Sequence, residues 1–402
     1  MAERALEGVR IVECGQNVAA AYAAKLMADM GADVVKIEEP GRGDLARQRG
    51  PYPGHIPHPE KSGLFLYLNT NKQGVTLDLR QAAGQDLFHR LLKDADALIH
   101  DYHPAEMASL GLDYSALEKV NPLLVMTSIT PFGLSGPRMN DQATDLTSWS
   151  AGGITYLNGG GPGTEEMPPL KPFGQQAGYQ AGVNASIATL GALFARLSTN
   201  EGQHIDISTQ ECLASILEFT FELYPYMGIF ASRLGQKPIQ PLDFLECKDG
   251  WIFLCCVEEH QWKGFLDVMD NPEWAGEAIF ADRVNRGANW DALKPLLQDW
   301  IQEQSVKDLY DKAQAKRVPI APVSSMGDLF NNAHLKARGF FATIVHPETG
   351  PLQYPGEIYK FSESPWAIRR PAPLLGQHNA EVYGRLGLSQ AEIENLKSRG
   401  VL

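Results

Sequence analysis

Two different spacings of apolar residues alternate along the first 130 residues of the chain. Short, nearly continuous apolar runs predict buried strands at residues 9–14, 32–38, 75–79, 96–101 and 123–133. Between them, apolar residues recur at helical spacing and predict helices over 19–31, 84–95 and around 114–120. Because strands joined by a right-handed helical crossover run parallel, this order predicts a doubly wound, Rossmann-like α/β sheet.

The pattern changes twice further along the chain. Residues 174–198 predict one long helix whose small residues allow another backbone to approach closely. An apolar strand at 249–257 and amphipathic helices at 260–269, 290–302 and 306–316 predict a small α+β domain. The segment 324–402 is rich in Pro and Gly, and we expect it to wrap over another domain. The predicted organisation is a large domain over 1–226, a small domain over 227–323 and a C-terminal segment over 324–402.

The net charge and the cysteines exclude several classes of partner and site. The chain has 402 residues and a formal net charge of −13, which argues against nucleic acid or an anionic membrane as partner. An anionic ligand would therefore need a local basic pocket. The five cysteines form no C-x-x-C pair and no metal-binding spacing with histidine, which predicts reduced core residues and no metal site. Since no run of about 18 apolar residues is present, we expect a cytoplasmic protein.

Common catalytic and nucleotide-binding motifs are incomplete. The turn after the first strand contains only Gly15 where a dinucleotide fingerprint needs three glycines, which argues against NAD. The glycine-rich segment 158–166 lacks the Gly-Lys-Ser/Thr of a phosphate-binding P-loop, so it either covers a ligand or is a mobile surface loop. The histidines show no pairing with Ser or Cys that would indicate a hydrolase.

Several segments together resemble the family III CoA transferases, which include formyl-CoA and carnitine CoA transferases and the α-methylacyl-CoA racemases. The resemblance lies in LEGVRIVEC, ADMGADVVKIEEPGRGDLAR, YLNTNKQGVTLDLR, LGLDYSALEKVNPLLVMTSITPFGLSGP, GQHIDIS, AHLKARGFF and PAPLLGQHN, in family order from Leu6 to Asn379. It implies a Rossmann-like large domain to which the C-terminal segment returns, a small α+β domain, and two ring-shaped chains interlocked as a dimer. CoA would lie on the large domain.

The resemblance also implies where a nucleophile should be. In the family, an aspartate four positions before the glycine equivalent to Gly178 attacks the acyl-CoA carbonyl and then carries CoA as a thioester. Gly174 occupies that position in this chain. Its neighbours Phe173, Gln175 and Gln176 offer no carboxylate, and we expect them to line the substrate pocket.

Other carboxylates are candidates to replace it. The racemase branch has a histidine before an acidic residue, and the matching pair here is Thr144 and Asp145, so proton transfer by that pair is lost. Asp145 is the first candidate for a substitute carboxylate, followed by Glu165 and Glu166.

The basic residues that contact CoA in the family are also fewer in this chain. Positions that are commonly arginine carry Glu39, His103 and Ser109. The candidate CoA contacts that remain are Arg42, Arg47 and Lys72. Each charge-assisted contact to phosphate contributes roughly 1.5–3 kcal/mol, so we expect weak binding of CoA, as a thioester substrate and not as a tightly bound cofactor.

These departures favour a CoA-transferase subunit that moves CoA between an acyl-CoA and a carboxylic acid but lacks the nucleophile. Its expected partner is a homologous, aspartate-bearing subunit, as in heteromeric members such as benzylsuccinate CoA-transferase. One alternative is a self-sufficient transferase that uses another carboxylate. The other is a protein that binds an acyl-CoA or an acid without turnover.

Overall fold

The computed structural model describes residues 4–160, 164–234 and 239–402. The chain forms two compact units, each described by itself. The large unit contains Met1–Gly159, Pro169–Ala231 and Ala337–Leu402, and the small unit contains Gly160–Pro168 and Ser232–Lys336. The domain limits at 226 and 323 stay a prediction.

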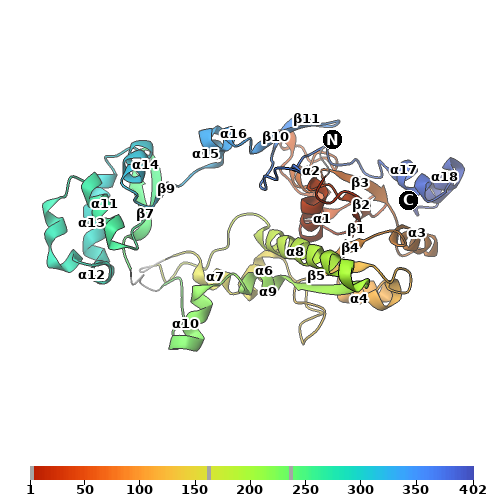
Figure 1. Cartoon of the computed structure of the whole chain (residues 1–402), viewed down its shortest axis with the longest axis horizontal. Coiled ribbons are helices and arrows are strands. Elements are labelled where there is room, and N and C mark those ends of the chain that lie inside the picture. Colours follow the sequence, from red (N-terminus) through yellow and green to blue (C-terminus); the bar gives the residue numbers. More distant parts are fainter. Residues whose placement is uncertain (1–3, 161–163, 235–238) are drawn as a thin grey trace. The chain divides into compact units, whose positions relative to one another are not determined.

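A parallel sheet of six strands forms the centre of the large unit (Figure 1). The strand order is β3-β2-β1-β4-β5-β6, and each neighbouring pair is parallel. The strands are β1 (Arg10–Cys14), β2 (Asp33–Glu38), β3 (Lys72–Thr76), β4 (Ala97–His100), β5 (Val125–Thr130) and β6 (Gln203–Ser208). The winding direction reverses between β1 and β4, so the predicted Rossmann-like α/β fold is confirmed.

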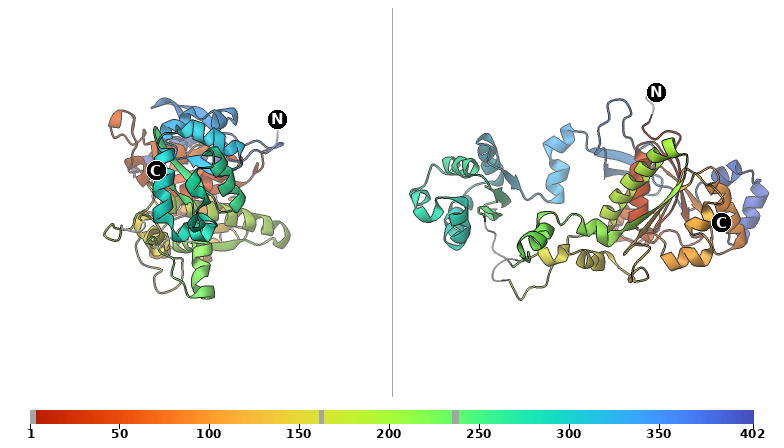
Figure 2. Two further views of the ribbon diagram at one scale, coloured as in Figure 1. Left: turned by 90° about the vertical axis from the view of Figure 1, so that its left-hand side faces the viewer. Right: turned by 60° about the horizontal axis from the view of Figure 1, so that its bottom comes forward.

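Helices cover both faces of this sheet, and alternate strand residues face each layer. On one face α1 (Ala19–Asp29) and α8 (Gln176–Thr199) run side by side (Figures 1 and 2). They approach so closely that a Cβ at Gly178 would lie 2.9 Å from Val18 Cβ, and one at Gly182 would lie 2.8 Å from the Ala19 carbonyl oxygen. This contact is the reason for the small residues of the predicted long helix.

The opposite face carries α3 (Ala82–Leu92), α17 (Asn379–Arg385) and α18 (Gln390–Ser398). The end of the chain is part of this layer, since Val401 and Leu402 are buried and the Asp78 N–H donates to the Val401 carbonyl at 2.8 Å. The other elements of the large unit are η1 (Leu45–Gln48), η2 (Pro53–His55), α2 (Gly63–Leu68), α4 (Pro104–Leu110), α5 (Tyr114–Leu117), α6 (Asp145–Ala151), α7 (Ile154–Leu157), α9 (Thr209–Ala214), α10 (Phe219–Met227), β10 (Phe341–His346) and β11 (Gly350–Pro355).

An antiparallel sheet forms the small unit together with its covering helices. The sheet order is β7 (Leu242–Cys247), β8 (Gly250–Cys255) and β9 (Ile320–Pro322). Its helices include α11 (Glu259–Val268), α12 (Arg283–Ala288), α13 (Trp290–Ile301) and α14 (Val306–Ala315), and the remaining elements are η3 (Glu273–Gly276), η4 (Ala278–Phe280), α15 (Met326–Asn331) and α16 (Ala333–Ala337). Apolar residues of the sheet and of α11, α13 and α14 share one core.

The third strand of the large sheet differs from its prediction. The apolar pattern placed it at 75–79, but β3 covers Lys72–Thr76 and pairs with Val34–Glu38 of β2. The predicted strand began too late because Lys72 and Gln73 are polar yet buried within the strand.

All five cysteines are free. Within the described part of the chain, no helix is long and apolar enough to cross a membrane.

Candidate functional site at the carboxyl ends of the parallel strands

A cavity of about 270 Å³ lies where the sheet changes winding direction. Its walls come from the segments that directly follow β1, β2, β3 and β4, together with Glu106 and Leu110 of α4. We call it the switch-point pocket, and it is lined by Gln16, Glu39, Arg42, Gly43, Leu45, Leu77, Asp78, Leu79, Arg80, Asp101, Tyr102, His103, Glu106 and Leu110. Open α/β sheets bind their ligands at this position.

A buried network of opposite charges lies beside the pocket, between β1, β2 and β3. The Lys36 ammonium contacts Glu13 at 2.9 Å and Asp44 at 2.8 Å, and Lys72 contacts Glu13 at 3.1 Å. The Lys72 ammonium also donates to Asn69 Oδ1 at 2.8 Å. Burial lowers the pKa of Lys72 to about 8, although Glu13 opposes this shift. The side chain of Lys72 is fully enclosed by protein acceptors.

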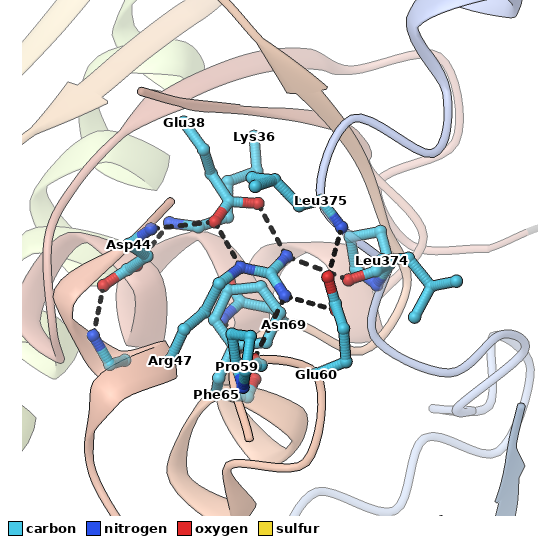
Figure 3. A network of polar contacts seen from close by, with 12 residues as sticks. Lys36, Glu38, Asp44, Arg47, Pro59, Glu60, Phe65, Asn69, Leu374 and Leu375 are labelled. Atoms are coloured by element: carbon cyan, nitrogen blue, oxygen red, sulfur yellow. Dashed lines mark hydrogen bonds and ion pairs between the residues drawn. The ribbon is translucent and has the colours of Figure 1, made fainter. Parts of the chain in front are cut away.

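The guanidinium group of Arg47 is likewise fully engaged in hydrogen bonds and ion pairs within the protein (Figure 3). Its Nε and Nη2 contact the two Glu38 carboxylate oxygens at 2.6 and 2.8 Å, and Nη1 contacts Glu60 at 2.6 Å. Nη2 also donates to the Pro373 carbonyl at 3.1 Å, and the guanidinium lies 3.6 Å from the centre of the Phe65 ring. Every guanidinium nitrogen therefore has a protein acceptor, and this geometry indicates an architectural role.

Of the three predicted CoA contacts, Arg42 alone lines the pocket. Its Nη1 contacts Glu39 at 3.4 Å, and 59% of its side-chain surface is exposed. Arg80 is a second exposed cation on the same wall, since its side chain is 65% exposed and contacts Glu39 at 2.6 Å and Asp78 at 2.8 Å. The sequence analysis missed Arg80, although its position directly after a predicted strand could have indicated it. His103 also lines the pocket and caps α4, where its Nδ1 accepts the Ala105 N–H at 3.3 Å.

The start of α1 connects the pocket to the beginning of α8. Gln16 lines the pocket, and Val18, two residues later, packs against Gly178 in the first turn of α8. The position of the family nucleophile, Gly174, lies two residues before this helix and has φ of +87°, a conformation that favours glycine. Among the described residues, a Cβ at Gly174 would meet only Gln176 Nε2, at 3.9 Å.

The predicted substrate-pocket residues surround this glycine. Phe173 is 99% exposed, Gln176 is exposed, and Gln175 is partly buried at the start of α8. Their role in binding substrate stays a prediction.

The structure brings Asp145 to the beginning of α8. Its Oδ1 accepts the Ala177 N–H at 2.9 Å, and its Oδ2 contacts the Lys171 ammonium at 2.8 Å. The same ammonium donates to the carbonyl oxygens of Pro172 at 2.7 Å and Gly174 at 2.6 Å. Asp145 is thus close to the nucleophile position, but both of its carboxylate oxygens are engaged in holding the segment before α8.

The remaining candidates lie elsewhere in the chain. Glu165 and Glu166 belong to the small unit. Residues 161–163 of the glycine-rich segment 158–166 lie outside the described residues. In the part of the chain that the structure describes, no group of three or more His, Cys, Asp or Glu side chains could hold a metal ion.

A doubly wound sheet with a charged pocket at its switch point places this chain in the class of open α/β proteins, whose ligand sites lie at the carboxyl ends of the strands. Comparison with known proteins identifies the family. Residues 6–379 match the model of CoA-transferase family III, and the chain belongs to this family.

Its relatives include proteins named as alpha and beta subunits of one transferase and transferases named without a subunit. The chain is 30% identical to the alpha subunit of succinyl-CoA–L-malate CoA-transferase from Chloroflexus aurantiacus, over 99% of this chain and 92% of that one. It is 30% identical to subunit BbsE of succinyl-CoA:(R)-benzylsuccinate CoA-transferase from Thauera aromatica, over 95% of this chain and 94% of that one. The crystal structure of a CAIB/BAIF family protein from Brucella suis superimposes with a TM-score of 0.84 at 28% identity, covering 95% of this chain and 99% of that chain.

Proposed function

We propose that this chain is the non-catalytic subunit of a family III CoA transferase that moves CoA between an acyl-CoA and a carboxylic acid. The observation that carries the proposal is Gly174. This residue has no side chain to attack a thioester, and its φ of +87° disfavours the aspartate that the reaction needs. The nearby carboxylate of Asp145 is held by Lys171 and the Ala177 N–H. The covalent steps then belong to an aspartate of the partner subunit.

Exposed apolar surface supports a stable partner. None of the nine residues of α10 is buried, although this helix contains Phe219, Phe221, Tyr226 and Met227. A helix that is apolar around its whole circumference is normally buried. Apolar side chains also project from one side of α8, at Ile187, Phe194 and Leu197. We propose that a homologous family III chain covers these surfaces in an interlocked dimer.

We place CoA in the switch-point pocket of the large unit. Arg42 and Arg80 are exposed enough to exchange their carboxylate partners for phosphate groups, whereas Arg47 and Lys72 are enclosed. Two guanidinium groups facing several carboxylates predict weak CoA binding. The CoA thioester is thus a substrate of the assembly and not a resident cofactor of this chain.

One observation favours a second function. Asp145 lies at the beginning of α8, within reach of the segment that carries the family nucleophile. If Lys171 released it, Asp145 could attack the thioester, and the chain would be a self-sufficient transferase. Glu165 and Glu166 are further candidates for the same role.

One experiment distinguishes the two proposed functions. This chain is co-expressed with a homologous chain that bears aspartate at the position of Gly174, and transfer of CoA to succinate or another acid is measured. The first proposal predicts a complex with both chains in equal amounts, whose activity is abolished when the partner's aspartate is replaced by alanine. It also predicts that this chain alone forms no covalent acyl adduct with acyl-CoA in hydroxylamine or borohydride trapping. Enzyme-like transfer by this chain alone, lost in Asp145→Asn, would establish the second function.

A further inference from the structure

Asp101 stands out among the residues of the switch-point pocket. It follows β4 directly, is partly buried, and forms part of the pocket wall. Its Oδ1 accepts the Gln16 N–H at 2.7 Å. Among the residues that the structure describes, no donor contacts Oδ2, so this oxygen is available to a ligand.

Negative charge predominates around this carboxyl group. Three other carboxylates and two guanidinium groups line the pocket, and the buried network lies next to it. The charged or titratable groups that interact electrostatically with Asp101 are Glu13 and Cys14 of β1, Lys36 of β2, Asp44 after β2 and Tyr102 after β4. Those that share the pocket wall with it are Glu39 and Arg42 after β2, Asp78 and Arg80 after β3, and His103 and Glu106 after β4.

These surroundings determine the charge of Asp101 near neutral pH. Burial raises the pKa of Asp101 to about 7. The Gln16 N–H opposes this shift, Asp44 and Glu13 add to it through repulsion, and Lys36 again opposes it. The group therefore exists in both protonation states at pH 7, and anything that binds one state better changes the balance.

We propose that Asp101 is a specificity-determining residue of the switch-point pocket, and that an anionic ligand binds there together with the uptake of one proton by its carboxyl group. The proposal rests on the proposed function in taking CoA as that ligand. When protonated, Oδ2–H donates a hydrogen bond to a phosphate oxygen. When ionised, the same oxygen repels that phosphate across a pocket already rich in carboxylates.

The proton balance follows directly. Above pH 7 the free protein carries mostly ionised Asp101, and binding takes one proton from solvent for each anion bound. Linkage then requires the Kd to increase by about tenfold for each pH unit above the pKa. Below pH 7 this dependence disappears, because Asp101 is already protonated.

The test is calorimetric titration of CoA into the full chain, or into its complex with the homologous subunit, at pH 6, 7, 8 and 9. Measurements at pH 8 in buffers of different ionisation enthalpy give the number of protons taken up. The test variant is Asp101→Asn, whose amide keeps an acceptor for Gln16 and always offers a donor. The matched control is Glu106→Gln, which removes an exposed carboxylate from the same pocket.

We expect Asp101→Asn to bind CoA about tenfold more tightly than the wild type at pH 8, with about one proton fewer taken up. Titration of the CoA phosphates contributes equally to both proteins and cancels in the comparison. Glu106→Gln should shift the Kd by a similar factor at every pH while the proton uptake stays unchanged.

Two results would overturn the proposal, and they differ in what else they refute. If CoA binds but Asp101→Asn shows the wild-type Kd and proton uptake, the role of Asp101 is wrong while CoA binding by this chain stands. If no variant binds CoA at any pH, both the role of Asp101 and the CoA pocket of the proposed function are wrong. Proton-linked binding that is lost in Asp101→Asn would support the proposal even if the chain proves to be catalytic.

Discussion

Replacement of Arg47 by methionine distinguishes an architectural cation from a ligand contact. Methionine has a similar length and fills apolar space next to Phe65, so the main loss is the charge. Glu38 would remain fully buried and would keep one hydrogen bond, from the Asp44 N–H at 2.9 Å. Glu60 would lose its guanidinium partner as well, but it would keep the hydrogen bond from the Leu375 N–H at 3.1 Å, and 19% of its side-chain surface is exposed and can be hydrated.

The expected loss follows from leaving Glu38 without its cation. Removing one partner of a buried ion pair costs about 3–5 kcal/mol, which is a large part of the stability of a typical domain. At about 2 °C for each kcal/mol, the melting temperature of the large unit should decrease by roughly 6–10 °C. The measurement is urea denaturation and calorimetry on the purified chain.

The matched control is Arg42→Ala. Arg42 is exposed and its contact with Glu39 is 3.4 Å long, so its removal should change stability by less than about 1 kcal/mol. It should nevertheless weaken CoA binding by about tenfold or more, since a charge-assisted phosphate contact contributes about 1.5–3 kcal/mol. Replacing Glu38 and Arg47 together by methionine should recover part of the stability lost in Arg47→Met.

The opposite pattern would refute this reasoning. If Arg47→Met keeps the wild-type stability but binds CoA much more weakly, the guanidinium is a ligand contact as the sequence resemblance implies. Glu38 and Glu60 would then be its partners only in the absence of ligand.

Further predictions concern the beginning of α8 and the acid sensitivity of the sheet. Gly174→Asp should form no trapped acyl adduct by mass spectrometry and should lower stability by about 1 kcal/mol, because its backbone has positive φ. Lys171→Met should lower stability by about 1–3 kcal/mol and accelerate limited proteolysis before α8, because it leaves the Asp145 carboxylate without its ion pair; an unchanged cleavage rate would contradict the role of Lys171. Burial, together with a smaller effect of His204, lowers the pKa of His100 to about 3, so the free energy of unfolding should fall as pH falls below 6.5 towards 3. In urea titrations, the free energy of unfolding should fall between pH 7 and pH 4.5, and this fall should be about 2–3 kcal/mol larger for the wild type than for His100→Gln.

The sequence predicted elements well wherever a local apolar pattern defines them. The long helix expected at 174–198 is α8, and the small-unit helices expected at 260–269, 290–302 and 306–316 are α11, α13 and α14 within one or two residues. The displaced position of β3 shows the limit. Lys72 is a polar residue in a buried strand, and it is tolerated there because it forms an ion pair with Glu13 of β1. Such pairing is invisible to a pattern read along one segment.

The roles of the candidate site residues stay a prediction, and they depend on contacts of the same long-range kind. Basic residues in a phosphate-binding family suggest ligand contacts, but Arg47 obtains its acceptors from Glu38, Glu60 and Pro373, the last more than 300 residues away. Only the folded arrangement shows which cations are already neutralised. Conversely, Arg80 became a candidate because the end of β3 opens into the pocket.

The discontinuous construction of the large unit also determines when it can be completed during synthesis. Residues 371–402 supply the Pro373 carbonyl beside Arg47, the helices α17 and α18, and the buried Val401 and Leu402 beneath the first strands. The ribosome adds about 5–20 residues each second, so the small unit, which ends at Lys336, emerges complete while the large unit still lacks these parts. For several seconds the nascent large unit therefore remains open, and this interval is available for a second chain to associate before the last helices dock.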